Sequence, residues 1–275
     1  MPSDKVYHFV AVNFNNSDET LIYIKSIISQ DFKNWNIVIV DNNSTIIDLV
    51  RLEDFCLNVP NVSLIKNEKN IGYFPALNIG LNAIQRNESD YIIVGNNDLS
   101  FQKDFIEKLN TLVLDDDVLV IAPNIVKLDV IHQNPHIISD FNLIEKIYRR
   151  VYYSNYYLAI TLQFFYSKLK LLKGGGNRKE NYRIIPILMG YGACYILTPN
   201  FFKHYKYLDA PVFLMGEEGI LASQVMRAGG ITLYHPELVV NHLDHTSIGK
   251  IPNKTLFKYS QLSYKYFIKN CKNVR

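Results

Sequence analysis

The first 125 residues alternate between short apolar runs and stretches in which apolar residues recur at helical spacing. The apolar runs have the length of strands and cover residues 6–12, 37–40, 62–65, 91–94 and 118–121. The helical stretches between them cover residues 21–28, 46–55, 76–84 and 101–114. This series predicts an α/β fold with a mostly parallel sheet and helices on both faces. We expect Pro123 to end the fifth strand.

The pattern is weaker in the rest of the chain. Residues 145–173 are basic and aromatic and predict a helix, which the glycines from Gly174 onward interrupt. The later elements are an apolar run at 191–197, a helix at 220–228, a strand at 238–240 and a basic helical tail at 255–267.

Polar clusters follow three of the predicted strands, at residues 13–16, 41–44 and 96–98. In parallel sheets, ligands bind beyond the carboxyl ends of the strands. Three separate segments therefore direct polar side chains toward one crevice, which predicts a binding site at this edge of the sheet.

The composition narrows the class of protein. The chain has 275 residues, with 48% hydrophobic residues, 20% charged residues and a formal net charge of +3. These values indicate a folded protein and do not favour nucleic acid as a partner. Cys56, Cys194 and Cys271 form no CxxC pair, which fits a reducing cytoplasm. The N-terminus lacks a signal-peptide layout, and no apolar run reaches the roughly 20 residues that span a bilayer.

Asp98 follows an apolar strand and two asparagines, Asn96 and Asn97. A carboxylate in this position is, in outline, a site for Mg²⁺ or Mn²⁺, which take oxygen ligands and share them with phosphate groups. The alternative is that Asp98 caps the following helix, although Ser100 could do so equally well.

Glu217 and Glu218 follow the run at residues 213–216. If both were buried, their repulsion would raise the pKa of one of them, which suits a general base. The alternative is a helix N-terminus, where the helix dipole favours acidic residues. Both interpretations can hold for the same pair.

His235, His242 and His245 lie close together near Asp244. No cysteine accompanies them, and strand geometry does not direct all four residues to one point, so a zinc site is disfavoured. A single histidine ligand, His242, beside a metal held mainly by Asp98 is favoured.

Asn70, Gly72 and Asn78 belong to a loop that leads into a helix. Glycine lets the backbone approach a ligand closely, and a helix N-terminus favours an anion. The spacing matches neither the dinucleotide fingerprint GxGxxG nor the phosphate-loop motif GxxxxGK[ST].

Taken in order, these segments resemble family 2 glycosyltransferases, which have the GT-A fold. The resemblance rests on residues 12–16, on Gln30 with 37–45, on Asn70, Gly72 and Asn78, on 96–98 as a variant D-x-D motif, on 213–218 as the counterpart of an FLYGED segment, and on Arg227, Gly229, Pro236, Val239, Val240 and His242. Within the family, the sequence looks most similar to the bacterial rhamnosyltransferase-like branch, which serves capsule and O-antigen synthesis. Two features depart from the family pattern: the metal motif keeps only its last Asp, and the acidic pair is Glu–Glu.

The resemblance implies an inverting transfer of a sugar from a nucleoside diphosphate sugar, with a UDP- or dTDP-sugar expected, to a hydroxyl of a glycan or lipid-linked acceptor. Asp98 would hold Mg²⁺ or Mn²⁺ with His242, Glu218 would be the base and Glu217 its partner. The residues implied for nucleotide-sugar binding are Val12, Phe14, Asp41, Asn42, Asn70, Gly72, Asn78 and Asn97.

On this interpretation the chain has four parts: a nucleotide-sugar-binding half (1–125), a helical insertion (126–185), an acceptor and catalytic half of the same domain (186–250) and a helical tail (251–275). The mixture of aromatic and cationic residues at 145–173 suits peripheral contact with the inner face of the cell membrane. The alternatives for this segment are a cover for the acceptor cleft or a homodimer contact.

Two other functions stay open. A sugar nucleotidyltransferase is disfavoured, because its Gly-rich loop bearing Arg and Lys is absent after the first strand. A noncatalytic module that binds glycans or nucleotide sugars is encouraged by the altered acidic motifs. Donor hydrolysis with Mn²⁺, and its loss in Glu218→Gln, would separate an enzyme from a binding module.

Overall fold

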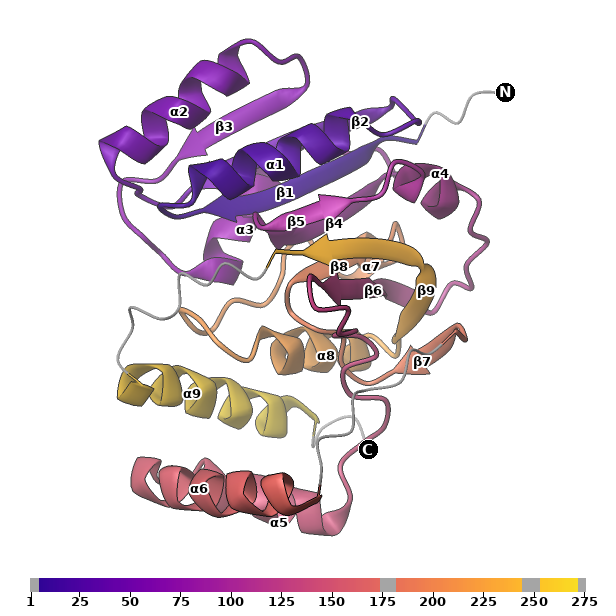
Figure 1. Cartoon of the computed structure of the whole chain (residues 1–275). Coiled ribbons are helices and arrows are strands. Elements are labelled where there is room, and N and C mark those ends of the chain that lie inside the picture. Colours follow the sequence, from indigo (N-terminus) through magenta and orange to yellow (C-terminus); the bar gives the residue numbers. More distant parts are fainter. Residues whose placement is uncertain (1–4, 174–181, 244–252, 272–275) are drawn as a thin grey trace.

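The computed structural model describes residues 5–173, 182–243 and 253–271. In these ranges, nine strands form one sheet in the order β3-β2-β1-β4-β8-β6-β9-β5, with β7 paired to β9 (Figure 1). The strands are β1 (Tyr7–Asn13), β2 (Trp35–Asp41), β3 (Val62–Lys66), β4 (Tyr91–Asn96), β5 (Leu99–Phe101), β6 (Val118–Lys127), β7 (Ile185–Ile187), β8 (Cys194–Leu197) and β9 (Ile231–His242).

Helices lie on both faces of this sheet, and further helices extend away from it. The helices are α1 (Ser17–Ile28), α2 (Ile46–Leu57), α3 (Tyr73–Ala83), α4 (Phe105–Asn110), α5 (Leu143–Tyr152), α6 (Tyr156–Lys173), α7 (Phe201–His204), α8 (Glu217–Arg227) and α9 (Asn253–Cys271). Below the sheet, α8, then α9, then the α5–α6 pair follow one another in Figure 1.

The direction of the strands sets where the site lies. Strands β1 to β4 are mutually parallel, whereas β8 runs antiparallel between β4 and β6. Strand β9 is parallel to β6 and antiparallel to β5 and β7. The predicted fold class, a mostly parallel sheet with helices on both faces, is confirmed.

Burial on both faces explains the continuous apolar runs of the sequence. In β1, Phe9 packs in the core that contains Tyr23 of α1, whereas Val10 packs in the opposite core that contains Leu77 of α3. These four side chains are fully buried. A strand covered on both sides must be apolar at every position, not at every second one.

The prediction that Pro123 ends a strand is wrong, because β6 continues to Lys127. The ladder between β6 and β9 shifts register between Pro123 and Asn124. A proline fits at such an irregularity, where its missing N–H interrupts no ladder hydrogen bond.

The predicted helix at 101–114 is also wrong in extent. Phe101 belongs to β5, opposite Val240 of β9, and the helix covers only Phe105–Asn110. The ring of Phe101 lies edge-on to the rings of Phe9 and Phe105. Tertiary packing of this aromatic cluster therefore overrides the local helical spacing.

In the second half of the chain, the helices are present but their boundaries differ from the predicted ones. Helix α8 begins at Glu217, earlier than predicted, and the predicted helix at 145–173 is two helices separated at residues 153–155. The predicted break from Gly174 onward lies outside the described residues. No helix in the part of the chain that the structure describes has both the length and the hydropathy needed to cross a bilayer.

Candidate active site

The carboxyl ends of β1, β2 and β4 are joined by Asn13, the last residue of β1. Its amide nitrogen donates to Asp41 Oδ1 at 2.9 Å and to Asp48 Oδ2 at 2.8 Å. Its amide oxygen accepts from Thr20 Oγ1 at 2.9 Å and from Asn97 Nδ2 at 3.2 Å. One fully buried side chain therefore ties three strand ends to the start of α1.

The electrostatics of this network follow from its donors. Burial alone would raise the pKa of Asp48, but hydrogen bonds from Asn13, Ser17 and Ser44 outweigh it, and the pKa is lowered. Neutral hydrogen-bond donors therefore favour the charged form of the Asp48 carboxylate.

Asp41 and Asn42, predicted to frame the nucleobase and ribose, are 1% and 3% exposed. Asp41 Oδ2 accepts from the backbone N–H of Ser44 at 3.0 Å. Asn42 Nδ2 donates to Asn70 Oδ1 at 2.9 Å and to the carbonyl of Gly72 at 3.1 Å. In this structure these side chains hold neighbouring loops in place.

Gly72 and Asn78 also make contacts within the protein. A Cβ at Gly72, whose φ is +98°, would lie 2.2 Å from the carbonyl oxygen of Phe213. Asn78 exchanges two hydrogen bonds with the backbone of Leu208, at 2.8 and 2.9 Å. Both residues therefore fasten α3 to the segment that leads to the acidic pair.

Three further residues predicted for the nucleotide site are accessible. Phe14, just after β1, is 38% exposed, and Val12 is partly exposed. Asn97 is partly exposed as well, and its amide nitrogen donates to Thr20 Oγ1 at 2.7 Å. Of the predicted set, Phe14 is the side chain best able to offer an open aromatic face to a base.

Asp98 lies next to His242, as the sequence predicted for two ligands of one metal. Asp98 is 5% exposed and His242 is 3% exposed. His242 Nε2 lies 3.3 Å from Asp98 Oδ1 without hydrogen-bond geometry, and among the described residues that oxygen has no hydrogen-bond partner.

Gln133 fixes the hydrogen on the other side of the His242 ring. Its Oε1 lies 2.7 Å from His242 Nδ1. Because an amide oxygen only accepts, Nδ1 carries a hydrogen, and Nε2 faces Asp98 Oδ1 either with its lone pair or, in the protonated ring, as an ion-pair partner. Two electron-rich atoms at this distance repel each other unless a cation or a proton lies between them.

This donor set fits a divalent cation. Carboxylate oxygen and imidazole nitrogen are both ligands of Mn²⁺, and a metal that binds a diphosphate needs few protein ligands. No group of three or more His, Cys, Asp or Glu side chains suited to a metal occurs within residues 5–173, 182–243 and 253–271. Asp244 and His245 lie outside those ranges, and His235 Nδ1 is buried with no hydrogen-bond partner among the described residues.

The acidic pair lies in the first turn of α8, so the helix-terminus interpretation and the base interpretation hold together. The preceding residues, Met215 and Gly216, both have positive φ angles, of 74° and 82°. Ser263 of α9 donates to the carbonyl of Met215. A left-handed conformation at a residue other than glycine is strained, and α9 holds this turn in place.

Glu217 and Glu218 differ in their surroundings. Glu217 is 7% exposed, and its Oε1 has no hydrogen-bond partner in the described part of the chain. Glu218 is partly exposed and accepts from the backbone N–H of Gly192 at 3.2 Å. A Cβ at Gly192 would lie 2.7 Å from that Glu218 oxygen, so only glycine permits this contact.

Burial raises the pKa of both acids. The pKa of Glu217 rises to about 8, because of burial and then because of the Glu218 charge. Burial also raises the pKa of Glu218, although the Gly192 N–H favours its charged form. Of the contacts around Glu218, the backbone N–H of Gly192 is the one that favours a negative charge on its carboxylate.

The residues just before β8 connect the acidic pair with the end of β4. The Asn96 N–H, at the end of β4, donates to the carbonyl of Ala193 at 2.8 Å, and Ala193 directly follows Gly192. The segment that ends at Asp98 is thus hydrogen-bonded to the residue next to Gly192, which contacts Glu218.

Sequence reasoning missed Gln133 and Gly192. Gln133 is remote from every motif, and its role depends on a contact with a residue 109 positions away. Gly192 stands in a glycine-containing run before β8, but nothing in that run indicates which side chain lies against it. Asn13 was part of a predicted polar cluster, although its central place in the network was not foreseen.

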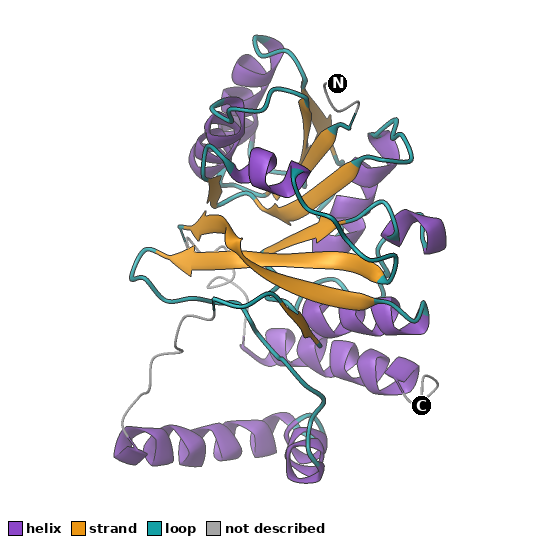
Figure 2. Ribbon diagram, turned by 90° about the vertical axis from the view of Figure 1, so that its right-hand side faces the viewer, coloured by secondary structure: helices purple, strands orange, loops and turns teal. Residues whose placement is uncertain are grey.

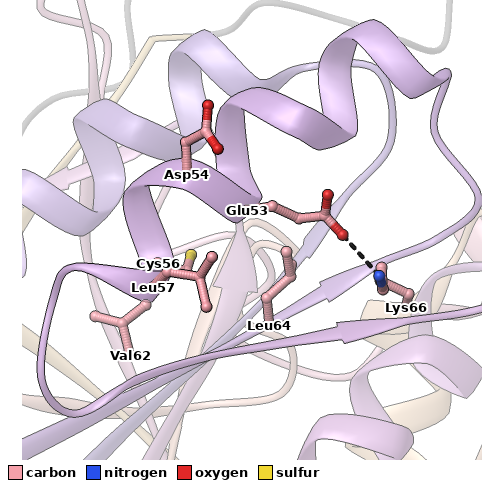
Figure 3. A pocket seen from close by; sticks show the side chains of 7 residues that line it. All are labelled: Glu53, Asp54, Cys56, Leu57, Val62, Leu64 and Lys66. Carbon is pink, nitrogen blue, oxygen red and sulfur yellow. Dashed lines mark hydrogen bonds and ion pairs between the residues drawn. The ribbon is translucent and has the colours of Figure 1, made fainter.

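A pocket of about 460 Å³ lies elsewhere, between α2 and the outer strand β3 (Figure 3). Glu53 and Lys66 form an ion pair across it at 2.6 Å. None of the predicted site residues lines this pocket, which is formed by Glu53, Asp54, Cys56, Leu57, Val62, Leu64 and Lys66.

The chain matches a known protein family over more than half of its length. The model of the family described as "Glycosyl transferase family 2" matches residues 9–173. A curated relative from Haemophilus influenzae, an "Uncharacterized glycosyltransferase", is 36% identical over 58 residues, which are 21% of this chain and 18% of that protein.

Solved glycosyltransferase structures share the fold at low sequence identity. GalNAc-T7, solved with UDP, GalNAc and Mn²⁺, superposes with a TM-score of 0.62 at 15% identity over 90% of this chain and 45% of that one. The mannosyltransferase PcManGT from Pyrobaculum calidifontis, in complex with GDP-Man and Mn²⁺, gives 0.55 at 13% identity over 98% and 72%. S. aureus TarS 1-349 gives 0.54 at 12% identity over 87% and 60%. This chain therefore spans less than half the length of the first of these proteins.

Proposed function

This chain belongs to glycosyl transferase family 2, and on that premise we propose that it transfers a sugar, with inversion, from a nucleoside diphosphate sugar to an acceptor hydroxyl. The observation that carries the proposal is the buried pair of Asp98 and His242, whose facing atoms lack a hydrogen bond to each other. Both atoms would be satisfied by a divalent cation, which these two residues would hold together with a diphosphate.

On the donor side, Phe14 offers its exposed ring to the nucleobase at the carboxyl ends of β1 and β2. Asp41, Asn42 and Asn70 keep the loops around that position in shape through their mutual hydrogen bonds. Because these polar groups already have hydrogen-bond partners within the protein, the loops are ordered before a ligand binds, and binding loses less conformational entropy.

Asp98 and His242 hold the divalent cation, which when bound acts as a Lewis acid on the leaving diphosphate. Gln133 keeps hydrogen on His242 Nδ1, so that Nε2 stays available as a ligand. The imidazole ligand favours Mn²⁺ over Mg²⁺, because Mg²⁺ prefers an all-oxygen shell. Titrating both metals against donor hydrolysis tests this preference.

Glu218 is the general base. The backbone N–H of Gly192 favours the charged form of its carboxylate, whereas burial and then the Glu218 charge raise the pKa of Glu217 to about 8. Its carboxylate takes the proton from the acceptor hydroxyl as that oxygen attacks the anomeric carbon in line, and the nucleoside diphosphate leaves from the opposite face. A positioned base is typically worth about 10²–10⁴-fold in rate.

The acceptor is a hydroxyl of a glycan or a lipid-linked sugar, in the manner of the rhamnosyltransferase-like branch that serves bacterial surface polysaccharides. The donor is a UDP- or dTDP-sugar. The proteins of similar fold that were solved with ligands contain UDP or GDP-Man together with Mn²⁺, which supports a nucleotide sugar with a divalent cation as the donor complex.

The experiment is a thermal-shift screen of nucleoside diphosphates and their sugars, with and without Mn²⁺, followed by donor hydrolysis. A ligand at about 100 times its dissociation constant adds about 2.7 kcal/mol to the free energy of unfolding. Asp98→Asn should abolish the metal-dependent part of the shift, whereas Glu218→Gln should keep it and lose hydrolysis.

Equal hydrolysis by the wild type and Glu218→Gln would remove Glu218 as the base. A thermal shift that is the same with and without Mn²⁺, and unchanged in Asp98→Asn, would remove the metal from the proposal. Binding of a nucleotide sugar without any turnover would favour the noncatalytic binding module.

A further inference from the structure

Helix α5 directs its apolar face away from the protein. Leu143, Ile144 and Ile147 are 73%, 79% and 56% exposed, and no residue of the helix is buried. Their spacing, continued by Tyr148 and Val151, forms one helical stripe. An amphipathic helix of a water-soluble domain normally turns this stripe toward the core.

This orientation is fixed by local structure. Asn142 and Glu145 form a capping box, with hydrogen bonds of 2.9 Å in both directions. Arg149 lies 3.8 Å above the ring of Phe141, on the side opposite the apolar stripe. Helix α5 is therefore well formed, and its exposed apolar face is a feature of the fold.

Helix α6 adds further exposed apolar side chains next to those of α5. It follows α5 after a short turn, and the pair lies apart from the sheet at the bottom of Figure 2. Its large apolar side chains are exposed as well, at Tyr157, Leu158, Ile160 and Phe165. Together the two helices expose more large apolar side chains than α2, where Ile46, Ile47, Val50 and Leu57 are exposed.

A basic stripe on α9 adjoins this apolar surface. Four lysines lie along one face of the helix, at intervals of four, seven and four residues, and all four are exposed: Lys254, Lys258, Lys265 and Lys269. Tyr264 of α9 stacks on Tyr153 at the α5–α6 junction, with ring centroids 4.5 Å apart. Lys254 lies 5.7 Å from the ring of Tyr157, so the basic stripe meets the apolar surface there.

The positive charge of this surface favours a negatively charged partner. In the sequences of α5, α6 and α9 the one acidic residue is Glu145, and its carboxylate is engaged in the capping box. A second copy of the chain would bring lysine against lysine with no acid to pair them. An anionic lipid surface offers both a layer for the apolar side chains and negative headgroups for the lysines.

We propose that the apolar face of α5–α6 and the lysine stripe of α9 together dock this protein on an anionic bilayer surface. The apolar side chains enter the interface, and the lysines pair with headgroups. The docking requires neither donor nor metal, so it stands or falls independently of the proposed sugar transfer.

The test is co-sedimentation of the full chain with phosphatidylcholine vesicles, with and without roughly one part in three of phosphatidylglycerol. Binding should require the anionic lipid and should be lost at about 0.5 M salt. Ile144→Ser with Ile147→Ser should weaken binding roughly 10- to 100-fold. The matched control is Leu57→Ser with Val113→Ser, which are 84% and 98% exposed on other elements.

A second pair of variants tests the charge separately. Lys258→Gln with Lys265→Gln should weaken binding to anionic vesicles roughly 10- to 30-fold, whereas Lys25→Gln with Lys103→Gln should leave it unchanged. All four lysines are exposed, so folding is not at risk.

Three results would overturn the proposal. The first is no vesicle binding by the wild type at low salt, and the second is equal binding to neutral and anionic vesicles. The third is a concentration-dependent dimer in sedimentation velocity that Ile144→Ser with Ile147→Ser abolishes while no vesicle binding occurs, which would assign the surface to a second copy.

Discussion

The two sides of the candidate site treat their polar groups in opposite ways. On the donor side, Asn13 satisfies the buried groups of Asp41, Thr20 and Asn97 through a closed network. On the acidic side, Glu217 Oε1 is buried and lacks a hydrogen-bond partner among the described residues, behind a strained turn at Met215. The polar groups of the donor side hold one another in fixed positions, whereas the acidic side keeps carboxyl groups in surroundings that raise their pKa.

The two kinds of buried polar group have opposite effects on the free energy of unfolding. A satisfied buried network contributes to stability, and its loss is costly. A buried carboxyl with a raised pKa lowers stability, and proteins keep such groups where chemistry needs them. Substitutions on the two sides should therefore change the free energy of unfolding with opposite signs.

The largest effect is expected where the two sides meet, at Gly72. In Gly72→Ala, the new Cβ clashes with the Phe213 carbonyl at 2.2 Å, and the φ of +98° is strained. We expect a loss of about 4 kcal/mol or more in urea-induced unfolding. Gly229→Ala is the control, because its φ is +70° and nothing lies within 4 Å, so it should lose only about 1–2 kcal/mol. Equal losses would show that the contact with Phe213 does not matter.

On the donor side, Asn13→Ala should lower the free energy of unfolding by about 3 kcal/mol, because Asp41 and Asp48 each lose a buried donor. Asp48 should then titrate at a higher pH than in the wild type, which NMR can measure. A variant as stable as the wild type would mean that the network is not what holds the strand ends together.

On the acidic side, Gly192→Ala should reduce turnover roughly 100-fold, because its Cβ displaces the Glu218 carboxylate. Stability should change by less than about 1 kcal/mol, since a flexible side-chain end can move. The matched variant is Gly219→Ala, whose Cβ would meet Phe267 at an ordinary 3.5 Å and should leave turnover unchanged. Similar kinetics for both variants would contradict the contact.

The smallest effect, and the one with the opposite sign, is expected for Glu217→Gln. Burial raises the pKa of Glu217 from its ordinary value near 4.5 to about 8 in the folded chain, so the unfolded chain loses this proton first. The carboxyl therefore lowers stability progressively as pH rises between these values. Glu217→Gln should be more stable than the wild type by about 1 kcal/mol or more at pH 9, with no gain at pH 4. Thermal unfolding at both pH values measures this difference. A variant less stable than the wild type at pH 9 would show that the Glu217 carboxyl does not lower the stability of the protein.

The sequence was most informative where one local rule determines the structure. Strands β1, β2 and β4 are buried on both faces, so their apolar runs marked them and the polar residues after them marked the site edge. Pro123 misled, because the rule that proline ends a strand fails where the ladder shifts register. Phe101 misled, because its aromatic packing outweighs local helical spacing.

The parts that could not be predicted depend on contacts between distant residues. The position of β8 between β4 and β6, antiparallel to both, has no local signature. That position places Gly192 against Glu218. The Gln133 contact with His242 likewise joins two segments that only the folded sheet brings together.

The central place of β8 also has a consequence for how the chain is made. Until residues 194–197 leave the ribosome, β4 lacks one of its neighbours and β6 lacks both, because β9 follows later still. A nascent or truncated chain that stops in the helical insertion would thus expose bare strand edges, which attract other chains. Fragments ending near residue 173 should aggregate on expression, and this enzyme should be produced only with its C-terminal third attached.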